Sequence, residues 1–240
     1  MPARLMSPLR LSGVRAVVTG ASRGIGRVIA EAYLREGAIL VVTARELAHL
    51  DALERSAAGQ PGRVARTVAL ELGDPASVRA AAHDARTVLG RVDVIVNNAA
   101  VLGERGPLTA TRGDALIDAL AINVAGPVGL VAALRDALAD DAVIINVTSG
   151  AAGRARWGTY GLTKAALNVA SQMLADEFAA RGVRCVAINP GGVRTEMRSA
   201  AYPAEDPASV PHPRSVAEPF IAIAAGAPAH GIIEAREWDT

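Results

Sequence analysis

Two residues that could exchange a proton lie four positions apart near the middle of the chain. Tyr160 and Lys164, in "YGLTK", open a predicted helix, so their side chains share one face of it. The ordinary pKa of a tyrosine, about 10, is too high for a base at neutral pH. An ammonium about 4 Å away would stabilise the phenolate by about 4 kcal/mol at an effective dielectric constant of about 20. The pair therefore predicts a tyrosine acid–base catalyst whose pKa the lysine lowers.

A glycine cluster near the N-terminus indicates a phosphate site. In "VTGASRGIGR" (18–27), Gly20, Gly24 and Gly26 follow a predicted strand and open a predicted helix, which is the context that a dinucleotide-binding turn requires. We expect Gly20 to permit the tight turn and Gly24 to let backbone N–H groups approach a pyrophosphate. Gly26 would let the helix pack closely on the strand. The helix N-terminus contributes about half a positive charge toward the phosphates.

The end of the second predicted strand bears on which dinucleotide is bound. An acidic residue there binds the ribose 2′-hydroxyl of NAD, whereas a basic residue accommodates the 2′-phosphate of NADP. The sequence reads "VVTAR", with Arg45 and no acid, and Arg23 lies inside the glycine turn. Either arginine alone could be a solvated surface residue. Together they favour NADP(H) over NAD(H), because two guanidinium groups suit a phosphate.

The elements that must position these residues alternate along the chain. Short apolar runs predict strands at 14–19, 38–43, 63–70, 92–97, 142–148 and 183–189, and longer Ala/Leu-rich runs predict helices at 24–36, 46–58, 75–89, 111–137, 157–181 and 215–225. Continuous apolar strands joined by helices indicate an α/β fold, a doubly wound parallel sheet with helices on both faces. We interpret residues 1–240 as a single Rossmann-like domain. The proline-rich segment 199–213, within about 195–215, is a substrate lid or an irregular loop.

Composition excludes several functional classes. The chain of 240 residues is 51% hydrophobic and carries a net charge of +1, which predicts neither nucleic-acid nor membrane-surface binding. The run around the single cysteine, Cys185, is that of a buried strand, and the lone thiol suits a cytoplasmic location. No apolar stretch has the length and freedom from charge of a transmembrane helix. The four histidines lack metal-ligand spacing, so no metal site is expected.

Five motifs in order resemble the short-chain dehydrogenase/reductase family. They are "TGASRGIG" (19–26), "NNAA" (97–100), "IN" (122–123), "YGLTK" (160–164) after "VTSG", and "NPGGVRTEM" (189–197). The resemblance covers about residues 12–198. The C-terminal 40 residues match less well, because "HGIIEAREWDT" replaces the usual glycine-rich final region.

The resemblance implies a role for each matching residue. Tyr160 would exchange the proton on the substrate oxygen, Lys164 would lower its pKa and bind the nicotinamide ribose, Ser149 would hydrogen-bond the carbonyl, and Asn123 would organise a water chain. Glu71 stands where the family usually has an aspartate near the adenine. The cofactor-binding set that the family implies is Gly20, Ser22, Arg23, Gly24, Ile25, Gly26, Arg45, Glu71, Leu72, Asn98, Ala99, Tyr160, Lys164, Pro190, Gly191, Val193 and Thr195.

Several points stay open at the level of sequence. The segment from Ser149 to Tyr160 is shorter than usual, so Thr148 could supply the substrate-polarising hydroxyl instead. Asn123 could be a polar helix residue satisfied by backbone groups. Trp157 and four arginines are expected around the pocket, and the arginines could face an anionic substrate or simply solvent. The four are Arg154, Arg156, Arg194 and Arg198.

The leading functional hypothesis is an NADP(H)-dependent oxidoreductase that interconverts a carbonyl and an alcohol on a small molecule. Two alternatives remain: a non-catalytic NADP-binding regulatory or scaffold protein, and a nucleotide-sugar epimerase, for whose larger substrate domain the chain leaves little room. The family also implies a homo-oligomer, a tetramer or a dimer, paired through the helices at 111–137 and 157–181.

Overall fold

The computed structural model describes residues 8–238, which form one seven-stranded parallel sheet with helices on both faces. The strand order is β3-β2-β1-β4-β5-β6-β7. The strands are β1 (Arg15–Val18), β2 (Ile39–Ala44), β3 (Arg63–Ala69), β4 (Val92–Asn97), β5 (Leu138–Val147), β6 (Arg184–Asn189) and β7 (Ile232–Glu234). The order reverses between β1 and β4, and ligands of such sheets bind at that switch point.

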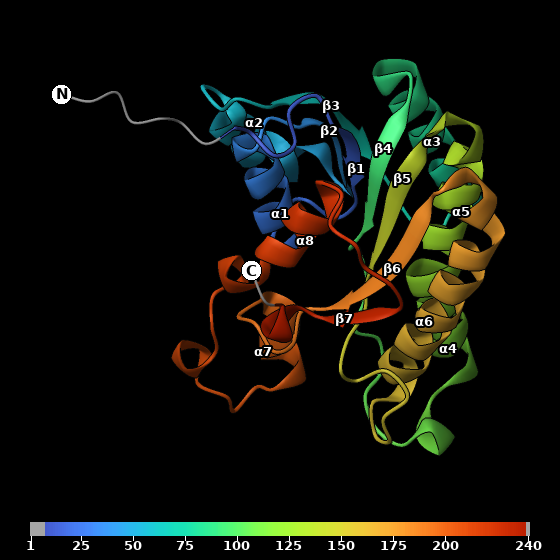
Figure 1. The fold of residues 1–240 in the computed structure, drawn as a ribbon. Coiled ribbons are helices and arrows are strands. Elements are labelled where there is room, and N and C mark those ends of the chain that lie inside the picture. The colour runs from blue at the N-terminus through green and yellow to red at the C-terminus, as the bar shows by residue number, and fades with distance from the viewer. Residues whose placement is uncertain (1–7, 239–240) are drawn as a thin grey trace.

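Eight α-helices are found in the part of the chain that the structure describes. They are α1 (Gly24–Arg35), α2 (Asp51–Ala57), α3 (Pro75–Leu89), α4 (Gly113–Leu120), α5 (Gly126–Leu134), α6 (Gly158–Phe178), α7 (Glu196–Ala201) and α8 (Glu218–Ala224). Figure 1 shows α1, α2 and α8 on one face of the sheet and α3, α5 and α6 on the other. Each face buries its own apolar cluster, centred on Tyr33 and Phe220 on the first face and on Leu130 and Leu134 on the second.

The residues predicted to cap the helix ends are found in capping positions. Asp74 caps α3 by accepting a hydrogen bond from the Ala76 backbone N–H at 2.8 Å, and Pro75 occupies the first turn. Gly37, Gly90 and Gly182 follow helical segments with φ between 67° and 92°, a backbone region that glycine enters at little cost. The fold class predicted from the sequence is thus confirmed, helices on both faces included.

Three predicted segments differ from the structure. The single helix expected at 111–137 is divided by a π-helical turn at Ala121–Ala125, because Pro127 has no N–H to donate to the carbonyl four residues earlier. The segment 199–213, expected to be irregular, includes the end of α7 and a 3₁₀ turn at Pro207–Ser209. The atypical C-terminus adds β7, which pairs in parallel with β6.

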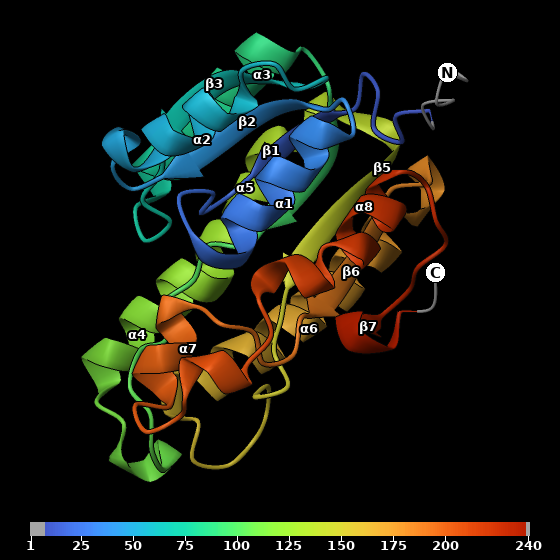
Figure 2. The same ribbon diagram turned by 90° about the vertical axis from the view of Figure 1, so that its left-hand side faces the viewer.

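The expectation that no segment has the character of a transmembrane helix needs correction: the helical stretch Gly113–Ala137 is long and apolar enough to cross a bilayer, judged by length and composition alone. Its second half packs on the sheet through Leu130, Val131 and Leu134, which are at most 1% exposed. The second half of this stretch therefore belongs to the core of the sheet's second face, whereas Ile117 in its first half is exposed. The loops after β4 and β5 lie with α4 and α7 at one end of the molecule (Figures 1 and 2).

Candidate active site

The sheet brings the sequence-predicted site residues to one edge. Gly20, Arg45, Asn98, Ser149 and Pro190 each come one to two residues after a parallel strand, respectively β1, β2, β4, β5 and β6. Parallel strands end at a common edge, so residues far apart in sequence gather there. The geometry of this edge decides what it can hold.

The glycine turn has no room for a side chain at Gly26. A Cβ on Gly26 would lie 2.4 Å from the Gly20 carbonyl oxygen and 2.3 Å from the Asn98 amide nitrogen. Gly20 and Gly24 have φ of 66° and 58°. Asn98 donates hydrogen bonds to the carbonyls of Thr19 (2.9 Å) and Gly20 (3.2 Å) and so fixes the turn. A tight, locked turn at the start of α1 fits a pyrophosphate group.

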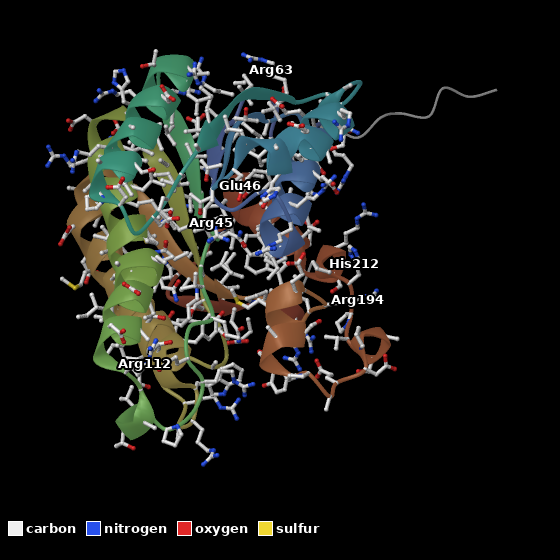
Figure 3. All side chains as sticks on the ribbon, turned by 180° about the vertical axis from the view of Figure 1, so that it is seen from behind. Arg45, Glu46, Arg63, Arg112, Arg194 and His212 are labelled. Carbon is white, nitrogen blue, oxygen red and sulfur yellow. The ribbon has the colours of Figure 1, made fainter. Side chains whose placement is uncertain are left out.

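The three residues expected around the adenosine end have different surroundings. Arg45 is exposed beside Glu46 at the end of β2, whereas Arg63 lies away from them at the start of β3 (Figure 3). Arg23 is also exposed but is ion-paired with Glu196 of α7. The exposed Glu71 accepts a bond from the Gly73 N–H at 3.3 Å. Of the two arginines expected to bind the phosphate, Arg45 has no carboxylate partner within residues 8–238. Arg23 would have to leave the carboxylate of Glu196 before it could bind a phosphate.

Ser149 and Tyr160 lie together at the end of β5 and the start of α6. Burial raises the pKa of Tyr160, and a hydrogen bond with Ser149 acts in the opposite direction. The Thr148 hydroxyl is buried and has no hydrogen-bond partner within residues 8–238. Of the two hydroxyls left open by the sequence, the one beside the Tyr160 phenol is that of Ser149.

Lys164, the only lysine in the sequence, is 2% exposed. Its Nζ donates to the Val147 carbonyl at 2.7 Å and lies 5.7 Å from the centre of the Tyr160 ring. Burial lowers the pKa of the ammonium to about 8. The expectation of a lowered Tyr160 pKa is not met in the cofactor-free protein, because burial of the phenol raises its pKa and the hydrogen bond with Ser149 only partly offsets that effect.

Asn123 lies at the centre of the π-helical turn and is 1% exposed. Its Oδ1 accepts from the Val101 N–H at 2.8 Å, and its Nδ2 donates to the Val101 carbonyl at 2.9 Å and the Thr163 hydroxyl at 3.0 Å. The side chain thereby ties the loop after β4 to α6, close to Tyr160. This is the backbone-satisfied arrangement that the sequence left open, and its hydrogen bond to Thr163 reaches α6 between Tyr160 and Lys164.

The loop after β6 carries the last group of predicted residues. Pro190 and Val193 are buried, Gly191 has φ of 68°, and Thr195 caps α7 by accepting from the Arg198 N–H at 3.1 Å. Arg194 lies next to His212 (Figure 3), and its N–H donates to the carbonyl of Pro211 at 2.9 Å. These contacts give the segment from residue 190 to 212 a defined shape against the glycine turn.

The remaining predicted residues are placed without strain. Ser22, Ile25 and Ala99 are half-buried around the glycine turn, and Leu72 is buried. A Cβ on Gly126 would lie 2.5 Å from the Leu72 carbonyl, so the chain after β3 is held closely against α5. Within residues 8–238, no group of three or more metal-ligating side chains is found.

Sequence reasoning placed Trp157 at the pocket but missed its neighbours Arg105 and Tyr202. Arg105, after β4, has its guanidinium carbon 4.4 Å from the centre of the Trp157 ring and 5.1 Å from that of Tyr202. Trp157 in turn lies 6.1 Å from the Tyr160 ring. Arg105 and Tyr202 belong to none of the motifs, so only the fold reveals that they lie against Trp157. Arg198, expected to offer a charge to the pocket, is instead neutralised by Glu205 through two bonds of 2.6–2.7 Å.

Comparisons with known proteins agree with this geometry. Residues 15–206 match the family model described as short chain dehydrogenase. The chain is 34% identical over 206 residues to the uncharacterized oxidoreductase YciK of Escherichia coli, covering 83% of this chain and 81% of that protein. It is 36% identical over 199 residues to L-xylulose reductase of Bos taurus, covering 81% of this chain and 78% of the other.

Solved structures share the whole fold. A short-chain dehydrogenase from Shigella flexneri 2a, crystallised with NADP, superposes with a TM-score of 0.89 at 30% identity and covers 96% of this chain and 100% of that one. The match therefore extends through the C-terminal region where the motifs end. The chain is an oxidoreductase that belongs to the short-chain dehydrogenase/reductase family.

Proposed function

We propose that this protein is an NADP(H)-dependent reductase or dehydrogenase that interconverts a carbonyl and an alcohol on a small molecule. The observation that carries the proposal is the grouping of Ser149, Tyr160 and Lys164 at the same edge of the sheet as a glycine turn in which Gly26 has no room for a Cβ. NADP in the Shigella flexneri structure and the carbonyl chemistry in the name of L-xylulose reductase support it.

The cofactor-binding role falls to residues of the sheet edge. Gly20, Gly24 and Gly26 would hold the pyrophosphate at the start of α1, and Arg45 would hold the 2′-phosphate, since no carboxylate in residues 8–238 pairs with it. Lys164 would bind the nicotinamide ribose through its ammonium. When bound, NADPH supplies the hydride for the carbonyl carbon.

The protein's own side chains handle the proton. The Tyr160 pKa is raised by burial, so the phenol carries its proton at neutral pH and can give it to a carbonyl oxygen during reduction. Ser149 would donate a second hydrogen bond to the same oxygen and stabilise the negative charge that develops there. Asn123 would act as a positioning residue that fixes the loop after β4 against α6.

The test is NADPH oxidation by the purified protein against a panel of aldehydes and ketones, with the Tyr160→Phe variant beside the wild type. Removing the phenolic hydroxyl should abolish turnover and leave the dissociation constant of NADPH within about threefold, because the ring and the helix remain. An equally active variant would refute the catalytic assignment. Tight NADPH binding without turnover of any carbonyl would favour the non-catalytic alternative.

We also propose a homo-oligomer assembled through α4 and α6. Large apolar side chains are exposed on these helices, namely Ile117 (67%), Val169 (62%) and Met173 (56%), and a second copy of the same face would cover them. The segment 195–215 would serve as the substrate lid of a single domain. A cytoplasmic location, where the Cys185 thiol stays reduced, completes the proposal.

A further inference from the structure

Three of the chain's seven aromatic residues gather at one place. The sequence has only two tryptophans, three tyrosines and two phenylalanines. Trp157 lies 6.1 Å from Tyr160 and 5.8 Å from Tyr202, ring centre to ring centre. Aromatic side chains give large binding surfaces with little conformational freedom. Such a concentration beside the candidate catalytic tyrosine indicates a wall of the substrate site.

An arginine from a separate loop lies against this wall. The guanidinium carbon of Arg105 lies 4.4 Å from the centre of the Trp157 ring and 5.1 Å from that of Tyr202. Stacking on aromatic rings holds a guanidinium by its faces and leaves its edge N–H donors available. Within residues 8–238, the Arg105 side chain makes no hydrogen bond or ion pair.

Backbone bonds on both sides of Arg105 fix the loop that carries it. The Glu104 carbonyl accepts from the Thr159 N–H at 3.1 Å. The Gly106 N–H donates to the Arg156 carbonyl at 3.2 Å, and the Gly106 carbonyl accepts from the Gly158 N–H at 3.0 Å. The loop after β4 is thus joined to the residues that lead directly into Tyr160. A cation placed this way needs little reorganisation to bind a ligand.

Two acidic side chains from the segments around Arg105 are already paired. Glu104 accepts from the Arg112 side chain at 2.7 Å. Glu205 is held by Arg198, whose own guanidinium stacks 4.2 Å from the Tyr202 ring. Arg105 is therefore a cation that stacks on this wall and whose charge no acidic side chain in residues 8–238 balances.

We propose that Arg105 recognises an oxyanion on the substrate, a carboxylate or a phosphate group carried by the same molecule as the reacting carbonyl. The proposal rests on the carbonyl–alcohol function proposed above and narrows its substrate class. The sum of two measured distances puts the guanidinium carbon no more than 10.5 Å from the centre of the Tyr160 ring. One small molecule can span that distance, with its carbonyl at Tyr160 and its anionic end at the arginine.

The experiment compares charged and neutral ketones of matched size. Levulinate and its one- and two-carbon longer homologues are assayed beside their methyl esters, and dihydroxyacetone phosphate beside dihydroxyacetone. The variants are Arg105→Met, which keeps the apolar stem, and Arg105→Lys, which keeps the charge. Arg79→Met on the exposed side of α3 is the matched control.

In the wild type, kcat/KM should be higher for at least one anion than for its neutral counterpart. Arg105→Met should lower kcat/KM for that anion by about 10- to 100-fold and change the neutral compound by less than about threefold. Arg105→Lys should recover part of the kcat/KM that Arg105→Met loses for the anion. Arg79→Met should leave kcat/KM for the anion unchanged. Which anion responds assigns the carboxylate or the phosphate. Equal losses for charged and neutral compounds would overturn the proposal.

A binding measurement separates this proposal from the proposed reaction. In a Trp238→Phe background, Trp157 is the only tryptophan, so its fluorescence reports ligands that contact the aromatic wall. Anion binding that Arg105→Met abolishes, without turnover of any ketone, would support the anion site and refute the reductase function. Turnover of neutral ketones without anion binding that depends on Arg105 would support the reductase function and refute the anion site.

Discussion

Replacing Lys164 by methionine should change how the stability of the protein depends on pH. The pKa of this ammonium falls from its ordinary 10.5 to about 8 in the folded protein because the group is buried. Each pKa unit corresponds to about 1.4 kcal/mol, so holding the charge inside the fold costs about 3 kcal/mol at neutral pH. Methionine keeps a similar length and volume and carries no charge, so that cost is absent in the variant.

The sign follows from proton binding. Between about pH 8 and pH 10.5, the unfolded wild-type chain holds a proton on Lys164 that the folded protein has lost. The free energy of unfolding of the wild type therefore rises with pH in this window, relative to Lys164→Met. Between about pH 7 and pH 9.5, the difference between the two proteins should change by about 2 kcal/mol in favour of the wild type. The Val147 carbonyl, left without a donor, destabilises the variant by about 1–3 kcal/mol at every pH.

The assay is urea unfolding of the cofactor-free proteins at a series of pH values and one protomer concentration. Leu167→Met is the control: it also places a methionine in the buried face of α6, and its difference from the wild type should not vary with pH. Other titrating groups are shared and cancel in the comparison. A Lys164→Met difference that stays constant from neutral to alkaline pH would show that the lysine is not a buried ammonium, and the reasoning would fail.

Three further predictions concern the site and the assembly. Ser149→Ala should lower kcat by about 10²-fold or more, the loss measured for one preorganised donor, whereas Thr148→Ala should do much less; the reverse order would mean that the wrong hydroxyl has been chosen. Arg45→Asp should shift the ratio of NADPH to NADH dissociation constants toward NADH, because repulsion replaces attraction at the 2′-phosphate; a fluorescence titration with an unchanged ratio would remove Arg45 from the site. The wild type should be an oligomer at micromolar concentration by light scattering, and Val169→Glu should reduce its mass; a wild-type monomer would exclude the proposed α4/α6 contact.

Much of the fold can be predicted from the sequence because its strands are short, apolar and buried on both faces. β2 and β6 have only one residue each that is not buried, so continuous runs such as "ILVVTA" cannot be mistaken for amphipathic surface. Capping residues add independent signals, as Asp74 and Pro75 do for α3. Alternation with long helical runs then leaves the parallel doubly wound sheet as the consistent arrangement.

The parts that sequence reasoning missed depend on contacts between distant segments. Strand β7 has only three residues, and the first and last of them are exposed, so its pairing with β6 leaves little hydrophobic pattern to read. Arg105 and Trp157 are 52 positions apart, and the sequence around either residue does not predict that the two side chains are in contact. The direction of the Tyr160 pKa shift was mistaken for a related reason: helical spacing gives the nearness of Lys164 but not the burial of the phenol.

The use of lysine rather than arginine at position 164 has a physical explanation. Of its 25 basic residues, 24 are arginines, and the single lysine is the buried one at the candidate site. An arginine there would keep its charge at any accessible pH and would present a planar fork to the single carbonyl of Val147. A lysine offers a compact ammonium whose pKa burial can bring to about 8. The single lysine thus lies where the proposed acid–base chemistry would need a small, titratable cation, and its burial costs about 3 kcal/mol of stability. That exchange of stability for chemistry is what an active site predicts and what a purely structural ion would not.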